Sequence, residues 1–191
     1  MAHCFIMDFE EATAAQYDAV IEDMELNGRL PAHALYHGAG SPDGSNWRVV
    51  DVWETPEDFE RFAAEKIGPI TARHGIGEPR MTTFPVHEIR RSDPEPVTFL
   101  HVVRLRGIEA AGFAELDKKL GPEPAEGLIF HANGPLDDGW ATVGFWTSKA
   151  ARDRFIQERI MPAMAGAGKP PTIEDLELHN ALTEAAVGTA A

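Results

Sequence analysis

The chain has 191 residues, 43% hydrophobic and 25% charged, so it is long enough for one large globular domain or two small ones. Its net charge of −14 excludes nucleic acids and anionic membranes as expected partners, because both are negatively charged. A single cysteine, Cys4, excludes an internal disulfide and a cysteine-rich metal site. The N-terminus is acidic and the chain has no long apolar run, so we expect a cytoplasmic protein with no signal peptide and no membrane helix.

The first predicted elements are a strand, a helix and a second strand. The apolar run His3–Phe9 favours a buried strand. Thr13 and Gln16 then form a capping-box pattern at the start of a helix with apolar residues at helical spacing. Gly28 suits the end of that helix, and residues 34–38 are typical of a second strand.

A hairpin and a second helix follow. Residues 41–46 are rich in turn formers and lead into the strand Trp47–Trp53. Thr55 and Pro56 predict the start of a helix, which Gly68 and Pro69 are expected to kink or break. Residues 81–89 are expected to form a single strand, which completes the order β-α-β-β-α-β.

The second half repeats this order after a proline-bearing connector at residues 93–96. We therefore expect one repeat over residues 1–92, a second over 97–183 and a weakly patterned tail over 184–191. The expected elements of the second repeat are strand 99–105, helix 114–120, strands 128–132 and 140–146, helix 149–165 and strand 173–182.

An internal duplication supports this division. His37 lies 94 residues before His131, whereas Trp47, Trp53 and Phe62 each lie 93 residues before an identical residue type. A period of half the chain indicates a duplicated structural unit and is too long for a solenoid repeat.

The order β-α-β-β-α-β predicts an α+β fold in which two ferredoxin-like repeats are fused in one chain. On the strand Trp47–Trp53, large apolar side chains alternate onto both faces, so both faces need cover. We expect helices to cover one face of each sheet, and the second sheet to cover the other face of the first. Such a chain is expected to be a monomeric pseudo-dimer or a weak homo-oligomer.

The strand-to-helix junctions DVWETPEDFERF, from Asp51, and GFWTSKAARDRF, from Gly144, resemble those of the dimeric α+β barrel superfamily. They are similar to the E-V-W-E-S junction of its members related to antibiotic-biosynthesis monooxygenases. The resemblance covers both halves and implies an intramolecular dimeric α+β barrel. Members of the superfamily include cofactor-free monooxygenases, haem-degrading enzymes, lactone isomerases and polyketide cyclases.

The resemblance also implies that Trp53 and Trp146 line pockets between sheet and helices, or else serve as core aromatics. Asp51 shares the face of Trp53, and Gly144 replaces it in the second half. A carboxylate on an inward face is a candidate general base, or alternatively a partner of Arg48, Arg80 or a backbone amide.

His37 and His131 occupy equivalent positions, as proton shuttles or as residues that fix a hairpin, and the sequence leaves their direction open. The first half keeps more polar groups on the expected pocket face, with Asp51 where the second half has Gly144, so we expect the working site in the first half. The predicted site there has Asp51 and His37 as catalytic residues, with substrate-binding residues Trp53, Tyr36, Trp47, Val49, Trp146 and His131.

The sequence departs from the family where haem-degrading members carry a histidine on the helix after the tryptophan. Those positions are Ala63 and Ile156, so we expect no haem. His33 and His37 are four apart but not on a helix and make a poor metal pair, and the sequence has no glycine-rich phosphate loop, so we also expect no metal and no other cofactor. The expected function is a cofactor-independent enzyme, of isomerase, cyclase or monooxygenase type, acting on a small apolar or aromatic metabolite. The alternative is a non-catalytic protein that binds small molecules or is associated with stress.

Overall fold

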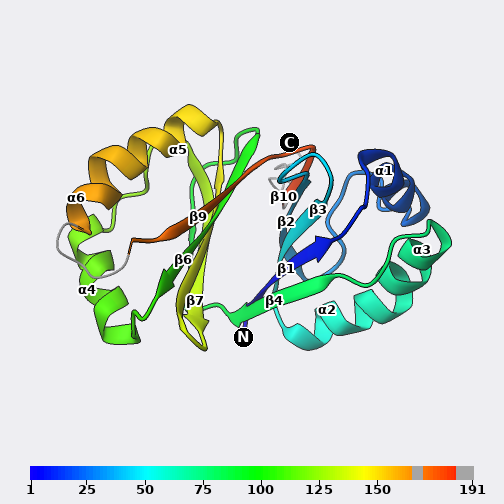
Figure 1. Ribbon diagram of the computed structural model, residues 1–191, viewed down its shortest axis with the longest axis horizontal. Helices are drawn as coiled ribbons and strands as arrows, with labels where there is room; N and C mark the ends of the chain where they lie inside the picture. Colours follow the sequence, from blue (N-terminus) through cyan, green and yellow to red (C-terminus); the bar gives the residue numbers. More distant parts are fainter. Residues whose placement is uncertain (165–169, 184–191) are drawn as a thin grey trace, which may run out of the picture. The chain divides into compact units, whose positions relative to one another are not determined.

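A computed structural model describes residues 1–164 and 170–183 of the chain (Figure 1). The fold divides into two compact units. Of the described residues, 1–85 and 178–183 form the first unit, and 86–164 and 170–177 form the second. Within the described residues, no helix is long and apolar enough to cross a membrane.

The first unit is built on a five-stranded sheet of order β10-β2-β3-β1-β4. Three of its strands, β1 (His3–Phe9), β2 (Ala34–Gly40) and β3 (Trp47–Trp53), confirm the predicted strands closely. The outer strands are β4 (Arg80–Pro85) and β10 (Asn180–Thr183). All pairings are antiparallel, and β3 lies at the centre of the sheet.

The second unit repeats this architecture with the order β5-β7-β8-β6-β9. Its central strands are β6 (Phe99–Arg106), β7 (Leu128–Leu136) and β8 (Gly139–Trp146). Its outer strands are β5 (Glu88–Arg91) and β9 (Thr172–Glu177). The α+β class and the two β-α-β-β-α-β units are therefore confirmed.

The prediction of single strands over residues 81–89 and 173–182 was wrong. Each segment is two strands that belong to different sheets. β4 pairs in the first sheet and β5 pairs with β7 in the second, whereas β9 pairs in the second sheet and β10 pairs with β2 in the first. A two-residue break separates each pair, and after it the His87 N–H donates to Asn133 O at 2.7 Å and the His179 N–H to Ala39 O at 2.8 Å. Hydrophobic periodicity predicts an extended chain but not the strand with which it pairs, so the exchange of β5 and β10 between the sheets could not be predicted from it. The tail expected over 184–191 lies outside the described residues.

The helices of each unit lie on one face of its sheet (Figure 1). In the first unit these are α1 (Ala14–Asp23), α2 (Pro56–Phe62) and α3 (Gly68–Arg73). The predicted capping box is present, since Thr13 accepts from the Gln16 N–H and the Gln16 side chain accepts from the Thr13 N–H. In the second unit they are α4 (Ala110–Leu120), α5 (Lys149–Phe155) and α6 (Met161–Ala163).

A π-helix connects the two helices on the C-terminal side of each central hairpin. It spans η1 (Ala63–Ile67) in the first unit and η2 (Ile156–Ile160) in the second. In each, the next N–H bonds five residues back, from Gly68 to Ala63 O and from Met161 to Ile156 O. Pro69 and Pro162 follow immediately and have no N–H, so the wider turn accommodates them without the expected break.

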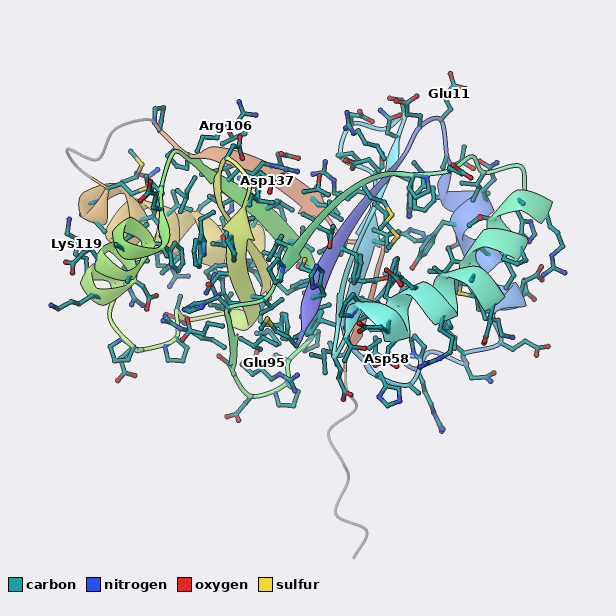
Figure 2. The ribbon with its side chains drawn as sticks, turned by 90° about the horizontal axis from the view of Figure 1, so that it is seen from below. Glu11, Asp58, Glu95, Arg106, Lys119 and Asp137 are labelled. Carbon is teal, nitrogen blue, oxygen red and sulfur yellow. The ribbon has the colours of Figure 1, made fainter. Side chains whose placement is uncertain are left out.

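Alternation along β3 places Trp47, Val49 and Trp53 in one hydrophobic cluster with Tyr17 of α1 and Phe59 of α2. In the second unit, Phe113 of α4 stacks on Trp140 of β8 with ring centroids 4.5 Å apart. Lys119 of the same helix points away from the sheet (Figure 2). The face of each sheet that lies under its helices therefore carries the aromatic side chains that the repeat preserves.

Candidate active site

A histidine and a carboxylate face each other across β2 and β3. His37 is the register partner of Asp51, and His37 Nδ1 lies 2.7 Å from Asp51 Oδ1. The side chains are 13% and 8% exposed, so the pair is largely shielded from water. The direction of His37, which the sequence left open, is toward the helices.

The second ring nitrogen of His37 continues this pair into a longer chain of hydrogen bonds. Its Nε2 lies 2.8 Å from the Tyr17 hydroxyl, and Asn180 Nδ2 donates to the same hydroxyl at 2.8 Å. A carboxylate only accepts, so the Asp51 contact fixes the proton on Nδ1 and leaves Nε2 as the acceptor for Tyr17. Burial raises the pKa of Tyr17, which keeps its hydroxyl protonated and able to donate.

Asp51, His37 and Tyr17 line a pocket in the first unit, so the interior beside Asp51 is hollow. The cavity volume is about 70 Å³, several times the roughly 10–15 Å³ that one water needs on the same measure. The indole N–H groups of Trp47 and Trp53 are buried and have no hydrogen-bond partner among the described residues. Other side chains around the pocket include Met7, Phe9, Val49, Phe62, Ile67 and Leu182.

The alternative ion-pair partners of Asp51 are engaged with another carboxylate. Arg48 Nε donates to Asp8 Oδ1 at 2.6 Å, and Arg80 reaches Asp8 Oδ2 at 3.3 Å. The hydrogen bond to His37 Nδ1 is the side-chain contact that the structure shows for Asp51.

Tyr36 does not take the place expected for it. It is 4% exposed and pairs in register with Val52, on the sheet face opposite that of His37, and it does not line the pocket. A β-bulge between Ala34 and Tyr36 shifts the register of β2. Strand alternation then requires neighbouring residues to point to opposite faces, so Tyr36 and His37 cannot both enter one pocket.

The second unit carries different residues at the same places. His131 is the register partner of Gly144, and His101 of β6 is the register partner of Gly144 from the other side. Trp146, His101 and His131 all line a cavity of about 70 Å³ in this unit. Burial lowers the pKa of His101 to about 3 and that of His131 to about 4, so both rings are neutral near pH 7.

The sequence did not single out Tyr17, Asn180 or His101 as site residues. Tyr17 is one of the apolar residues at helical spacing that follow Gln16 in the sequence, and its hydroxyl requires a partner when it is buried. Asn180 reaches the site only because β10 joins the first sheet. A comparison of the repeats would have found His101, because it stands opposite Gly144 as Phe5 stands opposite Asp51.

One group of metal-ligating atoms was found among the described residues, from His33, Glu54 and Asp58. None of the three lines either pocket, and Asp58, on the first turn of α2 (Figure 2), accepts from the Thr55 hydroxyl at 2.7 Å. This cluster is thus part of a capped helix start and separate from the His37–Asp51 pair.

The positions of the family histidine fall at the start of the π-helices. Ala63 begins η1, and Ile156 begins η2 and lines the second pocket. Neither side chain can ligate iron, so these positions do not fit a haem held in the manner of the haem-degrading members.

No protein-family model and no curated protein sequence matches the chain. Solved structures do match over nearly its whole length. Two are described as putative monooxygenases: one from Lactobacillus acidophilus, with a TM-score of 0.71, 13% identity and coverage of 96% of this chain and 97% of that one, and one from Fusobacterium nucleatum, with 0.73, 12%, 95% and 94%. A third, described as a putative chlorite dismutase, has a TM-score of 0.61 at 11% identity and covers 94% of this chain and 95% of its own.

These similarities confirm the fold that the junction motifs implied, namely two ferredoxin-like units in tandem. At such low identity they show the fold alone. The names also differ in reaction, so the chemistry has to be argued from the residues of this chain.

Proposed function

We propose that the first unit contains a cofactor-independent enzyme site that moves a proton on a small apolar or aromatic metabolite. The observation that carries this proposal is that both ring nitrogens of His37 are hydrogen-bonded, Nδ1 to Asp51 at 2.7 Å and Nε2 to Tyr17 at 2.8 Å. A histidine oriented by a carboxylate is suited to general acid–base catalysis near pH 7.

In the proposed step, a substrate C–H or phenolic O–H loses its proton to His37 Nε2 through the Tyr17 hydroxyl. Tyr17 gives its own proton to the ring and takes the one from the substrate. The ring becomes an imidazolium, which the Asp51 carboxylate stabilises, and the electron pair remains on the substrate as an enolate or phenolate.

The buried indole N–H groups supply a place for the negative charge. Trp47 and Trp53 line the same pocket and lack hydrogen-bond partners among the described residues, so each can donate to a substrate oxygen as charge develops on it. The walls are otherwise mostly apolar, which favours a substrate with an aromatic or aliphatic body.

The fate of the anion then sets the reaction type. Return of the proton to another atom gives an isomerisation or a cyclisation, with no net oxidation. An oxygenation of the kind suggested by the names of two fold relatives additionally requires O₂ as the oxidant.

A non-catalytic role is the second candidate, and the same network gives it a specific basis. Hydrogen bonds link four elements of the first unit, β10, α1, β2 and β3, through the side chains of Asn180, Tyr17, His37 and Asp51. Each of these hydrogen bonds joins two protein side chains. A fully satisfied buried network can serve to fix an architecture around a binding pocket.

Deuterium exchange separates the two candidates without knowledge of the natural substrate. Aromatic ketones with acidic C–H bonds, such as 2-tetralone and 1-indanone, are incubated with the protein in D₂O, and deuterium incorporation is followed by NMR. We expect catalysed exchange, reduced at least about 100-fold in His37→Asn and in Asp51→Asn variants that melt normally. Binding of these ketones without catalysed exchange would favour the non-catalytic role.

A further inference from the structure

A hydroxyl group that the first unit places beside its histidine is missing from the second unit. Phe113 lies 96 residues after Tyr17, the same offset that separates Phe5 from its counterpart His101. Each ring packs on the first tryptophan of its hairpin, with centroids 5.0 Å apart in the first unit and 4.5 Å apart in the second. A phenyl ring without a hydroxyl therefore stands where Tyr17 bonds to His37 Nε2 in the first unit.

His131, the counterpart of His37, makes no hydrogen bond through its ring. Its Nδ1 is buried and has no partner among the described residues, and no hydrogen bond to its Nε2 is found there either. The ring of His101 fills the place that Asp51 takes in the first unit, since a Cβ on Gly144 would lie 2.5 Å from His101 Nε2. An imidazole can make two hydrogen bonds, so a molecule that bonds to His131 satisfies a group that the chain leaves unsatisfied.

The cavity of the second unit limits the size of such a molecule. It is lined by both His131 and Phe113, and its volume is about 70 Å³. At the roughly 10–15 Å³ that one water needs on the same measure, it has room for about five to seven groups of the size of a water. The other walls are mostly apolar and include Val103, Leu105, Leu116, Ile160 and Met164. A ligand of this pocket is therefore small and has an apolar body.

The polar groups of the lining favour a neutral ligand. Burial lowers the pKa of His131 to about 4, so its ring is neutral at pH 7. Arg90 is already paired with Asp117 and Glu88, and Arg159 donates to two backbone carbonyls. A neutral imidazole has one N–H and one lone pair, and a hydroxyl both donates and accepts, so a hydroxyl can bond to Nε2 in either tautomer of the ring.

We propose that the second pocket binds a small neutral molecule with an apolar body and one hydroxyl group, of which phenol is the simplest aromatic case. Its hydroxyl bonds to His131 Nε2 as the Tyr17 hydroxyl bonds to His37 in the first unit. The ligand thereby supplies the group that Phe113 lacks. This site is distinct from the proposed proton-transfer site, and its test does not depend on any activity there.

Phenol is the probe, and toluene is its control of nearly the same size and shape without a hydroxyl. Each is titrated into the intact chain at pH 7 and followed by NMR at the Met164 methyl group, which lines the second pocket, and at the histidine side-chain nitrogens. We expect phenol to bind there at least threefold more tightly, although toluene is the more hydrophobic molecule, and to shift the His131 Nε2 signal. Toluene binding as tight as that of phenol or tighter, or no saturable shift at Met164 with phenol, would overturn the proposal.

Variants locate the site. Phe113→Tyr supplies the hydroxyl from the chain itself and should weaken phenol binding at Met164 at least tenfold. His131→Phe removes both ring nitrogens and should reverse the preference in favour of toluene, and it serves if Phe113→Tyr does not fold. Tyr17→Phe, at the equivalent position of the first unit, should leave the titration at Met164 within twofold of wild type. Unchanged phenol affinity in a folded Phe113→Tyr protein, a preference for phenol that persists in His131→Phe, or weakened binding in Tyr17→Phe would refute this location.

Discussion

The contrast between the two units can be tested by building the first unit's arrangement of Phe5, His37 and Asp51 into the second unit. The single change Gly144→Asp places a Cβ 2.5 Å from His101 Nε2 and 2.8 Å from Trp146 Nε1, both too close for an unshifted side chain. Overpacking of this kind costs about 1–3 kcal/mol, and the buried carboxylate adds to it. We expect Gly144→Asp to lower the free energy of unfolding by about 2–4 kcal/mol.

The double change Gly144→Asp/His101→Phe should reverse most of this loss. Phenylalanine at 101 reproduces Phe5, aspartate at 144 reproduces Asp51, and the buried Nδ1 of His131 gains the partner that His37 has in the first unit. A hydrogen bond to a charged group contributes about 1.5–3 kcal/mol. The double variant should therefore be at least about 2 kcal/mol more stable than the sum of the two single effects predicts.

Urea unfolding at pH 7, followed by tryptophan fluorescence and circular dichroism, measures all four proteins. A difference of 2 kcal/mol corresponds to roughly 4–8 °C in the melting temperature for a chain of this size. If the effects of Gly144→Asp and His101→Phe simply add, then the His101 ring does not occupy the place that the Asp51 side chain takes in the first unit, and this reasoning is refuted.

The remaining predictions concern stability at acidic pH, haem binding and the role of the Tyr17 hydroxyl. The pKa values of His101 and His131 are lowered to about 3 and 4, so the unfolded chain binds more protons than the folded chain below about pH 6.5. The free energy of unfolding should therefore fall as the pH drops from 6.5 toward 4, and it should fall by less in His101→Phe than in the wild-type protein. An equal fall in the variant and the wild type would count against this cause. A haem titration should give no one-equivalent Soret band that survives competition by albumin, because Ala63 and Ile156 cannot ligate iron. Tyr17→Phe removes the hydroxyl between His37 and Asn180 and should slow ketone exchange at least tenfold while changing stability by about 1–2 kcal/mol; exchange at the wild-type rate would remove Tyr17 from the pathway.

The sequence predicted those features of the fold that depend on local pattern. The Thr13 and Thr55 caps, the strand Trp47–Trp53 and the duplication are all encoded in neighbouring residues or in the spacing of the repeat, and the structure confirms them. The exchange of β5 and β10 was missed because it depends on pairing between segments far apart in the chain.

The same distinction explains the candidate site. Asp51 and His37 could be named because one shares a strand face with Trp53 and the other recurs as His131. Their direct pairing depends on the register of β2 against β3, which the hairpin loop sets by placing Gly40 opposite Arg48. The register at that loop has no marker in the sequence, and alternation allows only one of the neighbours Tyr36 and His37 to enter the pocket, which proved to be His37. Asn180 could not be predicted as a partner of Tyr17 without knowledge of the strand exchange.

The central claim, that His37 is the working base, is tested most directly by comparing two matched variants. His37→Asn and His131→Asn make the same change at equivalent positions of the two units, and deuterium exchange of 2-tetralone is measured for both beside the wild-type protein. We expect His37→Asn to lose at least about 100-fold in rate while His131→Asn stays within threefold of wild type. Equal rates in the two folded variants, or loss only in His131→Asn, would contradict it.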